Sequence, residues 1–514
     1  MRITLTHDIT CIEQRFNLCE KRRAILNDDG HMLILGGPGS GKTTIALLKA
    51  RRIVTRGLLD TQSVLFLSFS NSAVRRIAES AIDILRGEVG KKIEIKTYHS
   101  FSWDILHSHG YLLSQRRQLK IIPPYEAEIR RAGLDDAAWR REEGRLFIEE
   151  GLVTFDQFAP RTAELLNRCP RLLYIYANAY PYIIVDEFQD TDKAQWDIIK
   201  VLSAKCNIMA LGDPNQRIYD FRPGVSPKRI DEFSKQLSPQ VYNFANENNR
   251  SPGTGIANFA LALLQPSGRL PRCSEVKIVT FPPGRFSLWI KLATKQILFE
   301  TRKRAGCNDV KIAVAARTRT LVRLISDYLY DEHILKGKRY GPIAHDVLID
   351  QTQVFLAARV IAFLLEANVL NTKLATIRVL ELLADMHRAI GNKTHLAKAN
   401  QFQRWADMIR DGTPRATRLV QSITELVESL RQDTWSGSPR SDWIRVQKQL
   451  EKSEAEELKR VADNVRFLGI LRRGSGMEQS LIELWHTQEN YTGVTKAVET
   501  AILRDQILDS GHVG

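Results

Sequence analysis

The chain has 514 residues, more than one hydrophobic core usually holds, so we expect two or more domains. Apolar residues make up 43% of it and charged residues 26%, which is usual for a globular protein and excludes a disordered or fibrous chain. Lys and Arg outnumber Asp and Glu by 74 to 59, which favours a polyanionic partner such as nucleic acid, although an acidic protein or a membrane surface would also attract this charge.

The cysteines and the apolar runs exclude further classes of protein. The six cysteines are scattered and form no CxxC pair, which argues against a zinc ribbon or a disulfide framework. No apolar run approaches the roughly 20 residues that span a bilayer, and the N-terminus lacks the apolar stretch of a signal peptide. We therefore expect a cytoplasmic protein with no membrane partner.

Four short apolar runs in the first two-fifths of the chain are bounded by turn or polar residues. They cover residues 32–36, 63–69, 182–186 and 207–212, and they predict buried strands of a parallel sheet with helices between them. Residues 102–151 are charged and carry paired arginines, which indicates a helical inserted subdomain. The sequence thus predicts an α/β core in two parts, residues 1–101 and 152–235, around this insertion.

A glycine-rich loop follows the first predicted strand and opens a helix. Its sequence GGPGSGKT fits the phosphate-binding pattern GxxxxGK[ST], and a chance match is disfavoured because strand, loop and helix occur in the required order. Backbone N–H groups of such a loop point at phosphate oxygens, while Lys42 reaches the β- and γ-phosphates and the Thr43 hydroxyl ligates Mg²⁺. The predicted ATP-binding residues here are Gly36, Gly37, Pro38, Gly39, Ser40, Gly41, Lys42, Thr43 and Thr44.

A second acidic motif, VDEFQD, ends the third predicted strand at residues 185–190. Asp186 is placed to hold the magnesium hydration shell, and Glu187 is placed to act as general base toward the attacking water. Acidic residues also cap ordinary strand ends. The phosphate-binding loop upstream favours the catalytic interpretation.

The second half of the chain shows two further patterns. Residues 236–365 alternate again, and residues 274–281 and 310–315 are predicted as strands, each followed by a helix. Residues 366–514 show apolar residues mostly at helical spacing, which predicts a mainly helical domain.

The acidic motif and the phosphate-binding loop together resemble the UvrD/Rep branch of superfamily 1 helicases. In the family's order, residues 66–73 are similar to motif Ia, 97–101 to motif Ib, 211–222 to motif III and 248–251 to motif IV. The resemblance implies ATP, Mg²⁺ and single-stranded or partly duplex DNA as ligands. It also implies an α/β fold: a RecA-like P-loop parallel-sheet core with a helical insertion, a second, incomplete RecA-like core, and a helical C-terminal insertion.

Site residues follow from the resemblance position by position. Gln216 contacts the γ-phosphate and Arg250 serves as an arginine finger, which completes a catalytic set with Lys42, Asp186 and Glu187. The single-strand track is assigned to Phe69, Asn71, His99, Tyr219, Phe221 and Arg222. Aromatic stacking on bases needs no sequence readout, which agrees with this assignment, although core packing is the ordinary role of a lone Phe.

The pattern departs from the family in several places. Gln14 lies farther upstream of Lys42 than the family's adenine-contacting glutamine, Thr44 stands at an arginine position, and Asn249 stands at a tyrosine position. Motifs V and VI are not found, and their nearest matches, residues 333–337 and 315–319, are interpreted as surface loops. We therefore expect a piece of a longer gene product or a split protein, whose incomplete second core leaves an exposed sheet edge.

Two functions stay open from the sequence. The first is an ATP hydrolase that translocates on single-stranded DNA, in the 3′–5′ direction by resemblance, and unwinds duplex. The alternative is an ATPase switch or regulatory subunit with a protein partner, within a nuclease or phage-defence complex. A P-loop kinase of small substrates is disfavoured by the acidic motif and the aromatic turn.

Overall fold

The computed structural model describes residues 16 to 512, except for residues 17, 83, 86, 116–117, 218–223, 245–246, 252, 264–269, 279, 281–285, 308–309, 311, 336, 344, 346–350, 368–369, 414–415, 466–475 and 508–510. The chain forms two compact units. The first comprises residues 1–122, 140–277 and 506–514, and the second comprises residues 123–139 and 278–505. The finer division into five segments stays a prediction.

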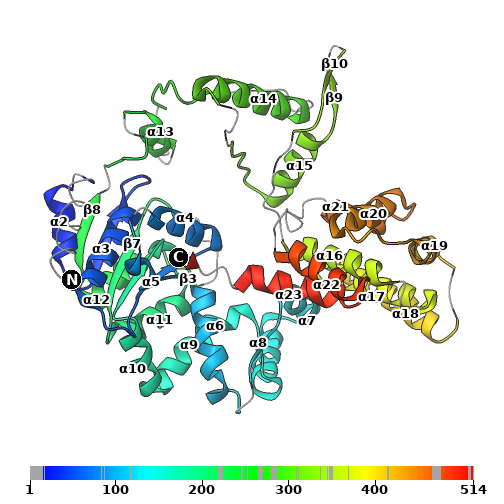
Figure 1. Ribbon diagram of the computed structural model, residues 1–514, viewed down its shortest axis with the longest axis horizontal. Coiled ribbons are helices and arrows are strands. Elements are labelled where there is room, and N and C mark those ends of the chain that lie inside the picture. Colours follow the sequence, from blue (N-terminus) through cyan, green and yellow to red (C-terminus); the bar gives the residue numbers. More distant parts are fainter. Residues whose placement is uncertain are drawn as a thin grey trace. The chain divides into compact units, whose positions relative to one another are not determined.

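A seven-stranded sheet forms the centre of the first unit (Figure 1), in the order β11-β3-β2-β6-β7-β1-β8. Its strands are β1 (Met32–Gly36), β2 (Val64–Ser68), β3 (Ile93–Thr97), β6 (Tyr182–Val185), β7 (Asn207–Gly212), β8 (Gln240–Phe244) and β11 (Gly511–His512). All neighbours pair in parallel except β11, which runs antiparallel to β3. The four strands predicted from apolar runs are confirmed as β1, β2, β6 and β7.

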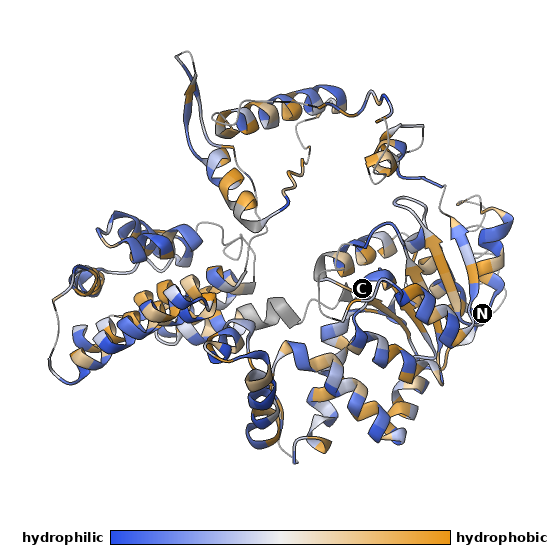
Figure 2. Cartoon of the chain, turned by 180° about the vertical axis from the view of Figure 1, so that it is seen from behind, coloured by the Kyte–Doolittle hydropathy of each residue, from blue (hydrophilic) through white to orange (hydrophobic). Residues whose placement is uncertain are grey.

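Helices cover both faces of this sheet. Successive strand residues point to opposite faces, so Met32 and Ile34 join one hydrophobic core while Leu33 joins the other. The first core includes residues of α2 (Glu20–Asn27), α3 (Lys42–Gly57), α4 (Asn71–Ile82) and α5 (Glu88–Lys91). The second includes residues of α6 (Tyr98–His109), α9 (Phe155–Arg168), α10 (Pro170–Ala179), α11 (Lys193–Ser203) and α12 (Arg229–Leu237). Figure 2 shows the strands in orange between helices that are partly blue.

The predicted helical insertion is divided between the two units. Helix α6 begins at Tyr98 and runs through the predicted boundary at residue 102. It is followed by η1 (Gly110–Leu112), β4 (Lys120–Ile121), α7 (Pro124–Arg131), α8 (Asp136–Arg145), the π-helical turn η2 (Leu146–Glu150) and β5 (Leu152–Val153). Strand β4 pairs with β5, whereas α7 packs on α16 and α17 of the second unit. The first unit also contains the turn η3 (Phe188–Asp190) and α13 (Ile256–Leu263).

The described part of the second unit is almost entirely helical. Its later helices are α16 (Gln351–Glu366), α17 (Thr372–Ile390), α18 (Lys393–Arg410), α19 (Arg418–Gln432), α20 (Pro439–Lys452), α21 (Glu456–Val465), α22 (Gly476–Gln488) and α23 (Val494–Ile507). Together they enclose one hydrophobic core, which includes Trp443 and Tyr491. The prediction of a mainly helical region after residue 366 is confirmed for these residues. Among the described residues, none of the helices has both the length and the apolar character needed to cross a membrane.

Two strand predictions in the second half are wrong. The described residues of 274–281 and 310–315 form no strand; this part of the chain has α14 (Phe286–Ala305), α15 (Arg319–Tyr330) and a hairpin of β9 (His333–Leu335) and β10 (Lys338–Tyr340). Ile278 is 72% exposed and Val314 45% exposed, whereas strands of a parallel sheet need cover on both faces. Residues 333–335, expected in a surface loop, are a strand, and the described residues of 278–505 contain no parallel sheet whose edge could stand open.

Candidate nucleotide site

The phosphate-binding loop connects β1, the strand next to the edge strand β8, to α3. Strand β1 lies between β7 and β8, and α3 begins at Lys42, so the loop emerges at the carboxyl edge of the sheet. Gly39 and Gly41 have φ angles of +75° and +87°, which glycine adopts without steric cost. Lys42 Nζ donates to the Gly36 carbonyl at 2.6 Å and to the Gly37 carbonyl at 3.1 Å. Burial lowers the pKa of Lys42, and nearby carboxylates, Asp213 first, partly offset this effect.

The acidic motif follows β6, two strands away from β1. Asp186 is 9% exposed, and its backbone N–H donates to the Leu67 carbonyl at 2.9 Å, which fixes its place at the end of the strand. Burial, with the neighbouring Glu187 as second cause, raises the pKa of Asp186 to about 7. Glu187 itself has a φ angle of +50°, in the left-handed region that a residue with a side chain rarely adopts. Such strain persists where surrounding structure holds it in place.

Gln189 connects the acidic motif to the segment after β7. Its side chain is almost fully buried; Nε2 donates to Glu187 Oε2 at 2.8 Å, and Oε1 accepts from the Asp213 backbone N–H at 3.0 Å. Asp213 Oδ2 in turn accepts from Gln216 Nε2 at 2.7 Å. Glu187 and Gln216, which the sequence assigned to one catalytic set, are therefore connected by a short chain of hydrogen bonds.

The segment after β8 packs directly on the phosphate-binding loop. The Asn249 backbone N–H donates to the Gly39 carbonyl at 2.7 Å. A Cβ atom on Gly39 would lie 2.5 Å from Asn248 Oδ1 and 2.7 Å from Arg250 Cβ, closer than atoms can approach. Gly39 is thus required both by its backbone angle and by the approach of Arg250.

Helix α2 contributes a residue that sequence reasoning missed. Arg22 Nη2 donates to the Ser40 carbonyl at 3.0 Å and forms an ion pair with Glu247, while its guanidinium lies 4.8 Å from the centre of the Phe244 ring. No motif marks Arg22 in the sequence, because its partners are far away along the chain. Gln189 could have been selected from the sequence, because it lies inside the acidic motif. Its hydrogen bond to Asp213, however, joins residues that are far apart in the sequence.

These segments surround a cavity of about 520 Å³, a volume within the usual range for ligand sites. It is lined by residues 37–44 together with Ala73, Arg76, Ile77, Glu79, Ser80, Asp186, Glu187, Gln216, Asn249 and Arg250. The structure therefore brings the predicted catalytic residues and nearly all of the predicted ATP-binding residues to one place.

The chemistry of this cavity fits a magnesium nucleotide. Its loop residues precede the N-terminus of a 16-residue helix, which favours an anion, and Lys42 adds a cation. The Ser40 hydroxyl is buried and has no hydrogen-bond partner among the described residues. Because the pKa of Asp186 is raised by burial and by Glu187, a cation beside it would stabilise its charged form.

Part of this chain is similar in sequence to a known protein family and to named relatives. The model of the UvrD/REP helicase N-terminal domain family matches residues 19–143 and 125–238. This part of the chain therefore carries the N-terminal domain of a UvrD/Rep-like superfamily 1 helicase. The ATP-dependent DNA helicase PcrA of Staphylococcus aureus (strain Mu50) is 27% identical over 288 residues, 47% of this chain and 39% of the relative. PcrA of Staphylococcus epidermidis (strain ATCC 12228) is 25% identical over 279 residues, 45% of this chain and 38% of the relative. This chain thus spans well under half the length of these curated relatives.

Of the remaining residues assigned from the UvrD/Rep resemblance, some lie in described elements and others lie outside the described residues. Phe69 follows β2 and is half-buried, and Asn71 begins α4. His99 lies in the first turn of α6, half-buried, with its ring centre 5.7 Å from that of Phe155 and 6.1 Å from that of Phe158. Gln14, Tyr219, Phe221 and Arg222 lie outside the described residues. Their roles stay predictions.

Proposed function

We propose that this chain is an ATP-dependent translocase and helicase of UvrD type, which couples ATP hydrolysis to movement on single-stranded DNA. The observation that supports this most strongly is that Lys42, Asp186, Glu187, Gln216 and Arg250 line the same cavity. Relatives over this part of the chain bear the name ATP-dependent DNA helicase. The disfavoured alternative, a P-loop kinase of small substrates, has no support from these relatives.

Each residue of the cavity has a distinct part in the proposed hydrolysis. Lys42 and Arg250 supply positive charge to the phosphate oxygens, and Thr43 and Asp186 hold Mg²⁺. Bound Mg²⁺ neutralises phosphate charge and orients the phosphate oxygens. Glu187 accepts a proton from the attacking water, and Gln189 fixes the Glu187 carboxylate through its 2.8 Å hydrogen bond.

The strand-binding side is proposed from the resemblance. Phe69, Asn71, His99, Tyr219, Phe221 and Arg222 contact single-stranded DNA, and movement proceeds 3′ to 5′. Gln216 senses the γ-phosphate and is linked through Asp213 and Gln189 to the base Glu187. Stacking on aromatic side chains would hold bases without regard to sequence.

Steady-state ATP hydrolysis with and without a single-stranded oligonucleotide tests this function. We expect DNA to stimulate turnover in the wild type and Lys42→Ala to abolish it, because the ammonium compensates β/γ-phosphate charge. Duplexes with a 3′ or a 5′ single-stranded tail then test displacement and polarity. Turnover that DNA leaves unchanged would contradict the proposal. DNA-stimulated turnover without strand displacement would favour the alternative, an ATPase switch.

A further inference from the structure

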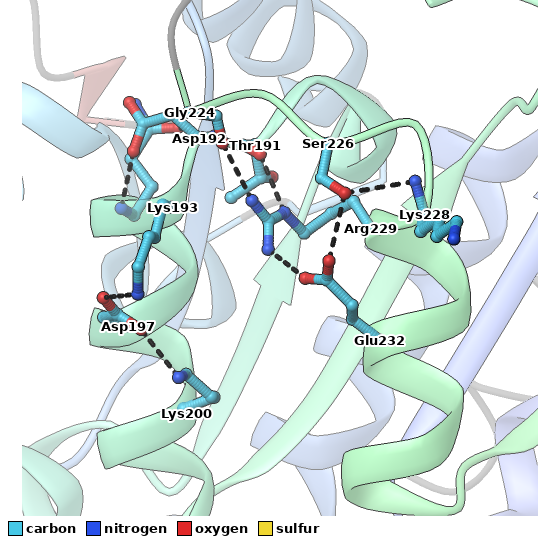
Figure 3. Close-up of polar contacts among 11 residues, drawn as sticks. Thr191, Asp192, Lys193, Asp197, Lys200, Gly224, Ser226, Lys228, Arg229 and Glu232 are labelled. Atoms are coloured by element: carbon cyan, nitrogen blue, oxygen red, sulfur yellow. Dashed lines mark hydrogen bonds and ion pairs between the residues drawn. The ribbon is translucent and has the colours of Figure 1, made fainter.

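Arg229 is a buried cation that no motif accounts for. It begins α12 and is only 3% exposed, whereas its neighbour Lys228 is exposed. An isolated buried charge is costly, so a guanidinium is retained in such a place only when its donors are used. Figure 3 shows its side chain directed at three groups: Thr191, Gly224 and Glu232.

The guanidinium joins three segments of the first unit. Arg229 Nε donates to the Thr191 carbonyl at 2.9 Å, and Nη2 donates to the Gly224 carbonyl at 3.0 Å. Nη1 forms an ion pair with Glu232, one turn along α12. Thr191 directly follows the acidic motif, and Gly224 lies two residues after the segment that resembles motif III. One side chain therefore connects Thr191 and Gly224, which are 33 positions apart in the sequence.

Backbone hydrogen bonds connect Thr191 to the turn that follows Glu187, the proposed base. The Thr191 N–H donates to the Phe188 carbonyl at 3.1 Å, and the Asp190 N–H donates to the Glu187 carbonyl at 3.0 Å. These bonds form the 3₁₀ turn η3, so a shift of Thr191 is passed to Glu187 within one turn. Because the φ angle of Glu187 is +50°, its backbone needs such external support.

Tyr98 belongs to the same hydrophobic core as Phe188 of η3 and Phe233 of α12. Tyr98 is 2% exposed, and this burial raises the pKa of its phenol. The next residue along α6 is His99, a predicted strand contact. The turn that follows Glu187, helix α12 and the helix that carries His99 therefore share one core.

We propose that Arg229 is a positioning residue for ATP hydrolysis, which holds the Thr191 end of the Glu187 turn against Gly224. This inference rests on the proposed function for the identity of the reaction. It predicts a defect in the chemical step rather than in nucleotide binding, because Arg229 is absent from the residues that line the nucleotide cavity.

The test compares Arg229→Met, Arg229→Lys and the neighbouring control Lys228→Met. Methionine keeps much of the apolar stem but removes every donor, so kcat should fall about 10-fold while KM for ATP changes less than about 2-fold, since small misplacements of a reacting group are costly. Lysine keeps the charge and can reach one carbonyl, so it should recover part of kcat. Lys228→Met removes a charge at an exposed position and should leave kcat unchanged.

Two measurements keep the result interpretable. Thermal unfolding and binding of a fluorescent ATP analogue establish that each variant is folded and binds nucleotide; if Arg229→Met is unfolded, Arg229→Lys alone is compared with the control. Turnover is measured both without and with DNA. A kcat defect in both conditions supports the positioning role even if DNA does not stimulate the wild type, which would be a failure of the proposed function only. A folded Arg229 variant with wild-type kcat, or with a change in KM alone, overturns the inference.

Discussion

Glu187 combines two properties that are typical of a catalytic residue. Its backbone is held in the left-handed region, and its carboxylate accepts a hydrogen bond from a buried glutamine. A strained non-glycine residue costs of order 1–3 kcal/mol and is found mostly at functional sites. The structure thus gives a reason, independent of the motif, to assign this carboxylate a role.

Glu187→Gln should bind ATP but hydrolyse it poorly, because the amide keeps the shape and cannot accept the proton. General-base catalysis contributes about 10²- to 10⁴-fold, so we expect kcat to fall by about that factor. Single-turnover hydrolysis measures the loss of the chemical step, and a nucleotide-binding titration measures the retained affinity for ATP. Wild-type turnover in this variant would remove Glu187 from the base role.

Gln189→Ala should weaken both stability and turnover. The substitution leaves the Asp213 backbone N–H without its 3.0 Å partner and frees the Glu187 carboxylate. An unsatisfied buried donor costs about 1–3 kcal/mol, which calorimetric or chemical unfolding would detect. Gln62→Ala is a suitable control, since that glutamine makes its contacts at an exposed position. A Gln189 variant with unchanged kcat would show that the bridge to Glu187 has no catalytic effect.

At the scale of elements, the second unit contains a polar cluster between α17, α18 and α21. Glu457 accepts from Lys398 Nζ at 2.8 Å and contacts His387 Nε2 at 3.0 Å. Burial by itself would raise the pKa of Glu457, but the hydrogen bonds from His387 and Lys398 outweigh it and lower the pKa to about 2. The carboxylate therefore stabilises the folded helices in its charged form.

This shift predicts the direction of a pH effect. The stabilisation by Glu457 is complete above the pKa of an unfolded glutamate, near 4.5, and is lost as pH falls toward about 2. Glu457→Gln should lower the free energy of unfolding at pH 7 by about 1–3 kcal/mol, and the difference from wild type should shrink below about pH 4.

Thermal unfolding followed by circular dichroism at several pH values measures this difference. Glu454→Gln is the matched control, because Glu454 and its partner Arg418 are 76% and 72% exposed and such pairs contribute little. An equal effect of the two substitutions on the free energy of unfolding would contradict a stabilising role of the charged Glu457 carboxylate.

At the scale of the whole molecule, the formal net charge is +15. A cationic surface binds single-stranded nucleic acid with release of counterions, so affinity should fall steeply with salt. The contribution of each cation is about 0.7 in the slope of log K against log salt, whereas stacking contributes nothing to it.

Two variants separate charge from stacking. Arg222→Ala should flatten the salt slope, while the double substitution of Tyr219 and Phe221 by alanine should weaken binding at every salt concentration with little change in slope. Fluorescence anisotropy with a labelled oligonucleotide over a salt series gives the affinity and its slope with salt. Unchanged affinity in both variants would remove Tyr219, Phe221 and Arg222 from the strand-binding site.

The sequence by itself determined the features that depend on neighbouring residues. The loop that ends in Lys42, the carboxylates of Asp186 and Glu187, and the strands that precede them are each encoded within a few consecutive residues. Their backbone conformation and their chemistry follow locally, because a buried parallel strand and a glycine-rich turn have recognisable compositions.

Only the tertiary structure decided which distant residues complete the site. Arg22 on Ser40, Gln189 on Asp213 and Arg229 on Thr191 join residues that are 18 to 38 positions apart, and their hydrogen bonds exist only after the sheet has formed. The same dependence explains the wrong strands at residues 274–281 and 310–315: their apolar alternation fitted a strand, but a strand forms only where neighbours pair with it and cover it. Local pattern specifies an element's preference, and long-range packing decides whether that preference is realised.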